Sequence, residues 1–156
     1  MAALENLAGT GQLLPEETSL DEISGYLLCA EQQLADARTT TLSPASRFSL
    51  AYDAAHAFAL AALRAHGYRP GRGLGHRMIV FSTLAHTVAS PAAEWSALAR
   101  YHTKRNASEY AGLTNASDAE ARDLIELTSA LGDRVRAWLG VHRSDLLSGK
   151  DQGNTE

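Results

Sequence analysis

The longest helical pattern in the chain reads SPASRFSLAYDAAHAFALAALRAHG and covers residues 43–67. Ser43 followed by Pro44 is typical of a helix start, and Gly67 is typical of a helix stop. Between them, apolar residues recur at helical spacing as one inner stripe: Phe48, Tyr52, Ala55, Ala59 and Leu63. The many alanines favour helix and allow neighbouring helices to approach closely. The pattern therefore predicts a central helix that ends near His66.

Amphipathic segments flank this helix and predict an all-α fold. Ser19 and Glu22 form a capping box at the start of a first helix. Three more helical patterns follow the central helix, over residues 76–88, 91–111 and 118–140. No window shows the alternation of a convincing strand. We therefore expect a compact antiparallel bundle of four to five helices with short loops.

The length and composition predict one domain. The chain has 156 residues, of which 45% are hydrophobic, enough to bury a single core. Residues 1–18 show little periodicity and predict a flexible leader, residues 19–146 form the bundle, and residues 147–156 predict a disordered polar tail. No stretch reaches the length of a membrane span, and no basic region precedes an apolar run. We expect a cytoplasmic protein without a membrane partner.

The charge is unevenly distributed along the chain. Residues 1–53 carry a net charge of −6, whereas residues 54–93 carry +4 and contain no acidic residue. Arg69 and Arg72 belong to this basic run and lie in a glycine-rich loop. Such a loop suits phosphate groups or an acidic partner, although dispersed arginines are also common on solvated surfaces. We expect Arg69 and Arg72 to take part in substrate binding.

Metal and nucleophile motifs are weak in this sequence. The lone Cys29 excludes an internal disulfide and a cysteine-based zinc site. Four of the six histidines recur every ten residues, a spacing that does not keep them on one helical face. Asp53 and His56 form the single pair in which a carboxylate precedes a histidine by three positions, and no nucleophile elbow is present. We therefore expect neither a metal site nor a cofactor.

The strongest functional clue is the polar stretch YHTKRNASEYAG at residues 101–112. An apolar helical stripe leads into it: Trp95, Leu98, Ala99 and His102. The same helical face continues with Arg105, Asn106, Glu109 and Tyr110. A face that is expected to be buried therefore becomes polar within two helical turns. A guanidinium is costly to bury unless it is paired. The stretch therefore predicts a functional site or, as the alternative, an ordinary ion pair between Arg105 and Glu109 at a helix end.

RNA cleavage without a metal is one chemistry that fits these residue types. It needs a cation for the phosphate and an imidazole or phenol that moves the proton of the 2′-hydroxyl. Arg105 supplies the cation, His102 lies one turn earlier, and Arg100 and Lys104 add positive charge. The alternative for His102 is a core histidine whose ring nitrogen bonds a neighbour.

Two segments resemble the HEPN superfamily of small helical nucleotide-binding domains. They are Ala51-Tyr52-Asp53-Ala54-Ala55-His56 and Arg105-Asn106-Ala107-Ser108-Glu109-Tyr110-Ala111-Gly112, and with the helix order the resemblance covers about residues 20–140. Active HEPN ribonucleases carry an Arg, usually followed by a polar residue such as Asn, and a His after four intervening residues. Arg105 and Asn106 match the first two positions, and Tyr110 stands in place of the catalytic His. The resemblance implies an HEPN-like fold and leaves open whether RNA is cleaved or only bound, with Tyr110 or His102 as the replacement base.

The resemblance also implies partners. HEPN domains usually dimerise through these helices, which would place Arg105, Asn106 and Tyr110 near a two-fold axis of a homodimer. Many members are toxins beside a small nucleotidyltransferase that serves as antitoxin, and some are silenced by nucleotide transfer to a tyrosine, a position that is Gly112 here. We therefore expect an RNA- or nucleotide-binding module of toxin–antitoxin or defence type. The alternative is a non-catalytic protein-interaction or dimerisation module in which the basic residues 54–93 bind an acidic partner.

Overall fold

A computed structural model describes residues 2–72, 76–110 and 115–147, without the side chains of residues 76 and 108–110. Within these residues the elements follow in this order: α1 (Ala2–Gly9), β1 (Leu13–Pro15), α2 (Leu20–Ala37), α3 (Pro44–Ala65), β2 (Tyr68–Pro70), α4 (His76–Ser82), α5 (Leu84–Thr87), α6 (Ala92–Tyr110), α7 (Asp118–His142) and a 3₁₀ turn, η1 (Ser144–Leu146). The all-α bundle predicted from the sequence is confirmed.

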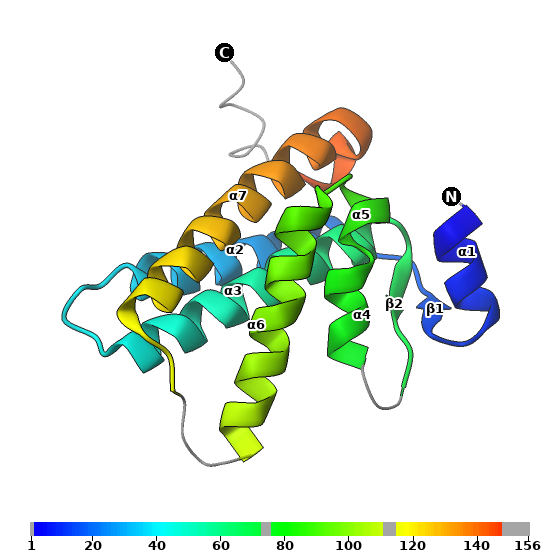
Figure 1. The fold of residues 1–156 in the computed structure, drawn as a ribbon. Helices are drawn as coiled ribbons and strands as arrows, with labels where there is room; N and C mark the ends of the chain where they lie inside the picture. The colour runs from blue at the N-terminus through cyan, green and yellow to red at the C-terminus, as the bar shows by residue number, and fades with distance from the viewer. Residues whose placement is uncertain (1, 73–75, 111–114, 148–156) are drawn as a thin grey trace.

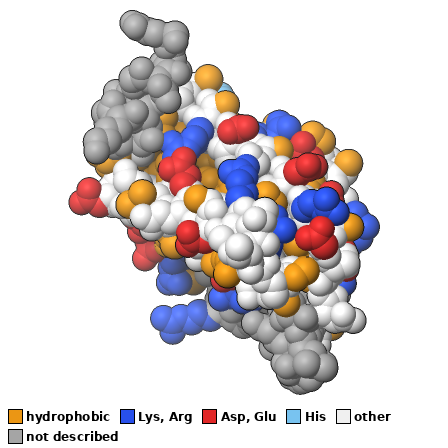
Figure 2. All heavy atoms as spheres, turned by 90° about the vertical axis from the view of Figure 1, so that its left-hand side faces the viewer, with side chains coloured by type: hydrophobic (Ala, Val, Ile, Leu, Met, Phe, Trp, Pro, Cys, Tyr) orange, Lys and Arg blue, Asp and Glu red, His pale blue; other side chains and the backbone are white. Residues whose placement is uncertain are grey.

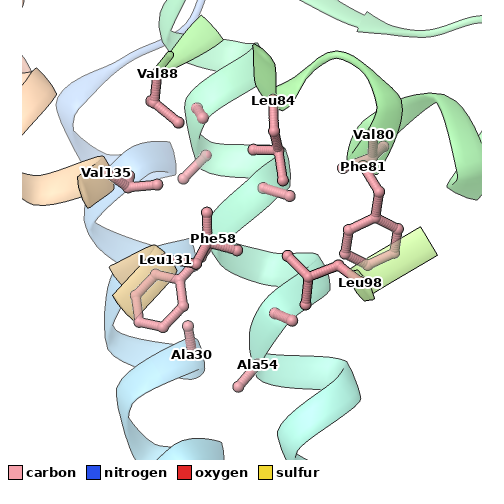
Figure 3. Packing of buried hydrophobic residues seen from close by; sticks show 14 of the residues in the cluster. Ala30, Ala54, Phe58, Val80, Phe81, Leu84, Val88, Leu98, Leu131 and Val135 are labelled. Carbon is pink, nitrogen blue, oxygen red and sulfur yellow. The ribbon is translucent and has the colours of Figure 1, made fainter. Parts of the chain in front are cut away.

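Helix α3 lies at the centre of the bundle and contacts α2, α4, α5, α6 and α7 (Figure 1). Figure 3 shows core side chains on both sides of α3: Ala30, Leu131 and Val135 from α2 and α7 on one side, and Phe81, Leu84 and Leu98 from α4 to α6 on the other. A helix packed on both sides buries residues all round, which the alanines of α3 allow at small volume. The central position predicted for residues 43–67 is therefore observed.

The contact between α3 and α7 depends on small residues. A Cβ atom added to Gly132 would lie 2.7 Å from Cζ of Phe58, so the ring occupies the space that a side chain at this position would need. Nearby, the hydroxyl of Thr128 donates to the backbone oxygen of Ala51 at 3.2 Å, although it is fully buried. This bond satisfies the hydroxyl inside the core and fixes the two helices against each other.

Helices α2, α3 and α7 each begin at a capping serine, at Ser19, Ser43 and Ser117. Ser117 and Glu120 form a reciprocal capping box at α7. Ser19 accepts from the backbone N–H of Glu22, but the Glu22 carboxylate bonds Arg64 instead of closing the box. The predicted helix over residues 76–88 is divided into α4 and α5 at Thr83, whose hydroxyl donates to a backbone oxygen in the preceding turn.

Residues 2–18, which the sequence predicted as part of a flexible leader, contribute a helix and a strand to the fold. They contain α1 and β1, and Leu4 and Leu13 are fully buried. Strand β1 pairs antiparallel with β2, so the bundle also carries a short two-stranded sheet that the sequence did not predict. Strands of three residues are too short for a readable alternation. Gly71 is required here because a Cβ atom would lie 2.2 Å from the backbone oxygen of Gly11.

The C-terminal end of α7 returns to the end of α3. Arg143 donates to the backbone oxygen of Ala65 at 2.7 Å and pairs with Asp145, and Leu147 is buried. The rest of the predicted tail, from residue 148, lies outside the described residues. In the described part of the chain, no helix is both long and apolar enough to cross a membrane.

Candidate functional site

The predicted site residues lie near the C-terminal end of α6. This helix crosses α3, and α4 lies between α6 and β2 (Figure 1). The side of α6 that carries Leu98 and His102 is buried, whereas Asn106, one turn further, is exposed. The change from an apolar to a polar face therefore coincides with the emergence of α6 from the core. Helix α6 ends at Tyr110, whose side chain lies outside the described atoms.

His102 is a buried histidine with hydrogen bonds at both ring nitrogens. Its side chain joins Tyr52 of α3 to Asn106: Nδ1 lies 2.7 Å from the Tyr52 hydroxyl and Nε2 lies 3.1 Å from Nδ2 of Asn106. Each ring nitrogen therefore has one polar partner inside the protein, the Tyr52 hydroxyl for Nδ1 and the Asn106 amide for Nε2. Only 5% of His102 is exposed, so the geometry is that of a core histidine satisfied by its neighbours.

Arg105 lies above the ring of Tyr52. The guanidinium carbon is 4.3 Å from the ring centroid, which is cation–π geometry. The guanidinium also pairs with Asp53 at 3.4 Å, and 16% of the Arg105 side chain is exposed. Two consecutive residues of α3 therefore hold Arg105 at the surface, one through its ring and one through its carboxylate. The alternative pair with Glu109 involves a side chain outside the described residues.

Tyr52 connects the buried and exposed parts of the site. Burial raises its pKa above 10, and a hydrogen bond from Arg77 and the charge of Arg105 oppose that rise. The phenol is therefore neutral at neutral pH. Arg77 is exposed on the first turn of α4.

Sequence reasoning missed Tyr52, Asp53 and Arg77 as members of this site. Tyr52 fitted the inner stripe of the central helix, and Arg77 was one of several dispersed arginines. The available signal was the polar pair Tyr52-Asp53, which interrupts an alanine-rich helix. Only the packing of α6 on α3 shows that this pair faces Arg105.

Two polar contacts attach α6 to the first turns of α7. Lys104 pairs with Glu120 at 2.5 Å, and the Tyr101 hydroxyl donates to Asp123 at 2.5 Å. The hydrogen bond from Lys104 lowers the pKa of Glu120, while burial and the Asp123 carboxylate raise the pKa of Tyr101 to about 12. The charge of Lys104 is thus partly neutralised by a carboxylate of the same chain. Arg100, the other basic residue predicted here, is exposed.

Arg69 and Arg72 are not brought beside Arg105. Arg69 lies on β2 and pairs with Glu16 at 3.4 Å, and Arg72 follows β2 and is exposed. Helix α4 lies between β2 and α6 (Figure 1). Arg64, from the same basic run, is buried against Glu22. The acidic N-terminal segment therefore neutralises part of the basic middle of the chain.

A groove of about 480 Å³ lies on another part of the surface, between the end of α2 and α7. Arg38, Arg47 and Arg122 line it together with Glu126 and Asp133. Asp118 pairs with both Arg47 and Arg122. Figure 2 shows basic and acidic side chains intermingled over this face. The groove is lined by charges of both signs, three arginines and two carboxylates, and contains none of the predicted site residues.

No group of three or more His, Cys, Asp or Glu side chains that could hold a metal ion occurs among the described residues. No protein-family model, curated protein or solved structure matches the chain. Function is therefore inferred from the geometry around Arg105 and from the residues of the α6 motif.

Proposed function

We propose that the chain is an HEPN-like module that binds RNA or nucleotides, of the type found in toxin–antitoxin or defence systems. One observation carries the proposal: Arg105 is held over the ring of Tyr52 at the surface, next to the exposed amide of Asn106. These are the two residues that match the HEPN motif. A cation that is already positioned loses little conformational freedom when a ligand binds.

Binding is a better supported role than cleavage. Cleavage needs a group that accepts the proton of a 2′-hydroxyl. Both ring nitrogens of His102 are hydrogen-bonded inside the protein, and burial raises the pKa of the Tyr52 phenol. Tyr110 is the remaining candidate, and an un-ionised phenol is a weak base at neutral pH. Any ribonuclease activity should therefore be slow, independent of metal and dependent on Tyr110.

The proposal includes a homodimer in which two α6 motifs lie together, and a nucleotidyltransferase-type antitoxin as partner. The alternative function, a non-catalytic protein-interaction module, is favoured by one observation. Lys104 pairs with Glu120 and Arg105 pairs with Asp53, so the positive field at the site is weaker than the sequence indicates. A steep decrease of RNA affinity with added salt would support the RNA role, and a flat response would support the alternative.

The first experiment measures binding of labelled single-stranded RNA and tRNA in EDTA by the wild type and two variants. Arg105→Ala removes the proposed contact. Arg136→Ala is the matched control, because Arg136 is also partly buried and ion-paired, with Glu31, on the α2–α7 side of the molecule. Losing one charged contact should weaken binding about tenfold in Arg105→Ala and leave the control almost unchanged.

Equal affinity of the wild type and Arg105→Ala would contradict the proposed site. The same samples on a denaturing gel report cleavage, and light scattering reports the oligomeric state. Cleavage that is lost in Tyr110→Phe would establish a ribonuclease, whereas intact RNA with retained binding would establish a binding module.

A further inference from the structure

Arg77 is a second arginine that reaches Tyr52, from the opposite helix. Helix α4 contacts both α3 and α6, and its Phe81 ring packs against Tyr52 and His102, with ring centroids 5.9 Å apart in each pair. Arg77 lies one helical turn before Phe81 and therefore on the same face of α4. Its guanidinium accordingly contacts the Tyr52 hydroxyl. Arg77 from α4 and Arg105 from α6 therefore meet at one phenol.

The two arginines differ in how far their charge is neutralised. Arg105 pairs with Asp53 at 3.4 Å, and 16% of its side chain is exposed. Arg77 is exposed, and no carboxylate among the described side chains forms an ion pair with it. Helix α4 also belongs to the run of residues 54–93, which contains no acidic residue. Arg77 therefore keeps its positive charge next to the motif of α6.

Unbalanced positive charge is what the RNA backbone requires. Phosphates bind the N–H groups at the edge of a guanidinium, and each neutralised phosphate releases counterions. At Arg105, the neighbouring Asp53 balances part of the charge and repels a second anion. At Arg77, a single hydroxyl neither balances the charge nor occupies all the N–H donors of the guanidinium. The arrangement therefore favours Arg77 as a phosphate contact.

We propose that Arg77 binds the phosphate backbone of single-stranded RNA at the start of α4, beside the α6 motif. This inference rests on the proposed function and adds a binding residue from outside residues 105–110. Arg77 thereby supplies the positive charge that the ion pair with Asp53 partly removes from Arg105. Because the contact is with the backbone, it should strengthen binding of different RNA sequences by similar factors.

The test measures how RNA affinity depends on salt. Fluorescence anisotropy with a labelled single-stranded RNA in EDTA, at several salt concentrations, compares the wild type with three variants: Arg77→Gln, Arg77→Lys and Arg38→Gln. Each phosphate contact contributes about 0.7 to the slope of log affinity against log salt for single strands. Arg77→Gln should therefore reduce the slope by about 0.7 and weaken binding about tenfold at low salt.

The other two variants are controls that should keep the wild-type slope. Arg77→Lys retains the charge, and a lysine also binds phosphate. Arg38 is likewise an exposed arginine without an ion pair among the described side chains, but it lines the groove between the end of α2 and α7. Thermal unfolding should be almost unchanged in all three variants, because both arginines are exposed.

Four outcomes overturn the inference. An unchanged slope in Arg77→Gln shows that Arg77 makes no phosphate contact, and a large fall in its Tm shows that Arg77 is structural. Equal losses of affinity in Arg77→Gln and Arg38→Gln show a diffuse attraction to exposed arginines rather than a site. In these three cases the RNA-binding function stands if Arg105→Ala still weakens binding. If the wild type binds no RNA, the proposed function and the phosphate contact are both wrong.

Discussion

Arg64 and Arg105 are both largely withdrawn from solvent, but the protein holds them in different ways. Arg64 is 3% exposed and directs its nitrogens to three oxygens: Nε to Glu22 at 2.5 Å, and the other two to the backbone oxygens of Glu16 and Glu17 at 2.9 and 2.8 Å. Arg105 is 16% exposed, lies on a ring face and pairs with Asp53 at 3.4 Å.

The difference distinguishes a structural arginine from a candidate binding arginine. Arg64 donates short hydrogen bonds to backbone oxygens and so attaches the segment after β1 to α3. These bonds occupy its N–H groups, which are then not available to a ligand. A ring face and a longer ion pair position Arg105, and the side chain keeps some solvent exposure. The two residues are hard to distinguish in the sequence, because both occur at helical spacing among apolar residues.

The largest expected effect comes from Arg64→Ala. The substitution removes the guanidinium from two backbone oxygens and from the Glu22 carboxylate, which keeps the Thr18 hydroxyl as a donor. Breaking a buried ion pair costs about 3–5 kcal/mol. Urea unfolding should therefore show a large loss of stability. Arg136→Ala, which removes the more exposed pair with Glu31, should cost less than about 1 kcal/mol in the same assay. Similar losses in both variants would contradict a structural role specific to Arg64.

Tyr52→Phe should have an intermediate effect on stability and little effect on binding. It removes the hydroxyl that pairs with Nδ1 of buried His102, and an unsatisfied buried polar group costs about 1–3 kcal/mol. The ring beneath Arg105 remains, so RNA affinity should change by less than about twofold. Chemical unfolding and RNA titration of the same variant check both statements. A large loss of affinity would show that the hydroxyl, rather than the ring, supports the site.

Arg105→Ala should cost only about 1 kcal/mol of folding stability, the value of a partly exposed cation–π contact. Its effect on RNA affinity should exceed its effect on folding, which is the reverse of the expectation for Arg64→Ala. Urea unfolding curves of the two variants, recorded in parallel, test this contrast. If Arg105→Ala were as destabilising as Arg64→Ala, the proposed distinction between the two arginines would fail.

The smallest expected effect is a pH dependence at the end of α3. Burial lowers the pKa of His66 below 6.5, against the hydrogen bond to the Thr87 backbone oxygen, and the positive charge of Arg143 lowers it further. The unfolded chain therefore binds more protons, so stability is complete above pH 6.5 and decreases as the pH falls below it. Unfolding curves at about pH 7.5 and pH 5 should show this decrease.

In His66→Gln the decrease should be smaller than in the wild type, because the residue at this position no longer titrates. Trp138, which stacks on His66 at 4.5 Å between centroids, remains in place as the packing partner. Equal pH dependence in both proteins would assign the effect to other groups.

The sequence predicted most of the helices because their signals are local. The caps at Ser43 and Ser117 and the apolar stripe of residues 48–63 place α3 and α7 within a few residues of their observed bounds. The strands β1 and β2 were missed because each has three residues and is defined by its partner, not by its own pattern. For the same reason, α1 and the buried Leu4 were assigned to a flexible leader.

The candidate site was predicted only in part. Arg105, Asn106 and His102 stand out because polar residues continue an apolar stripe on one helix. Their partners Tyr52 and Asp53 lie on α3, about 50 positions earlier, and no local pattern links the two segments. The sequence therefore named the residues of α6 but did not show which of them are satisfied inside the protein.

By itself the sequence determined an all-α chain with a central alanine-rich helix and a polar end on α6, because helical periodicity and capping act within a few residues. Tertiary structure alone decided that the charge of Arg64 is buried, that His102 is bonded at both nitrogens and that Arg105 lies over Tyr52. Burial and hydrogen bonding depend on groups about 40 to 50 positions apart that meet only when the helices pack.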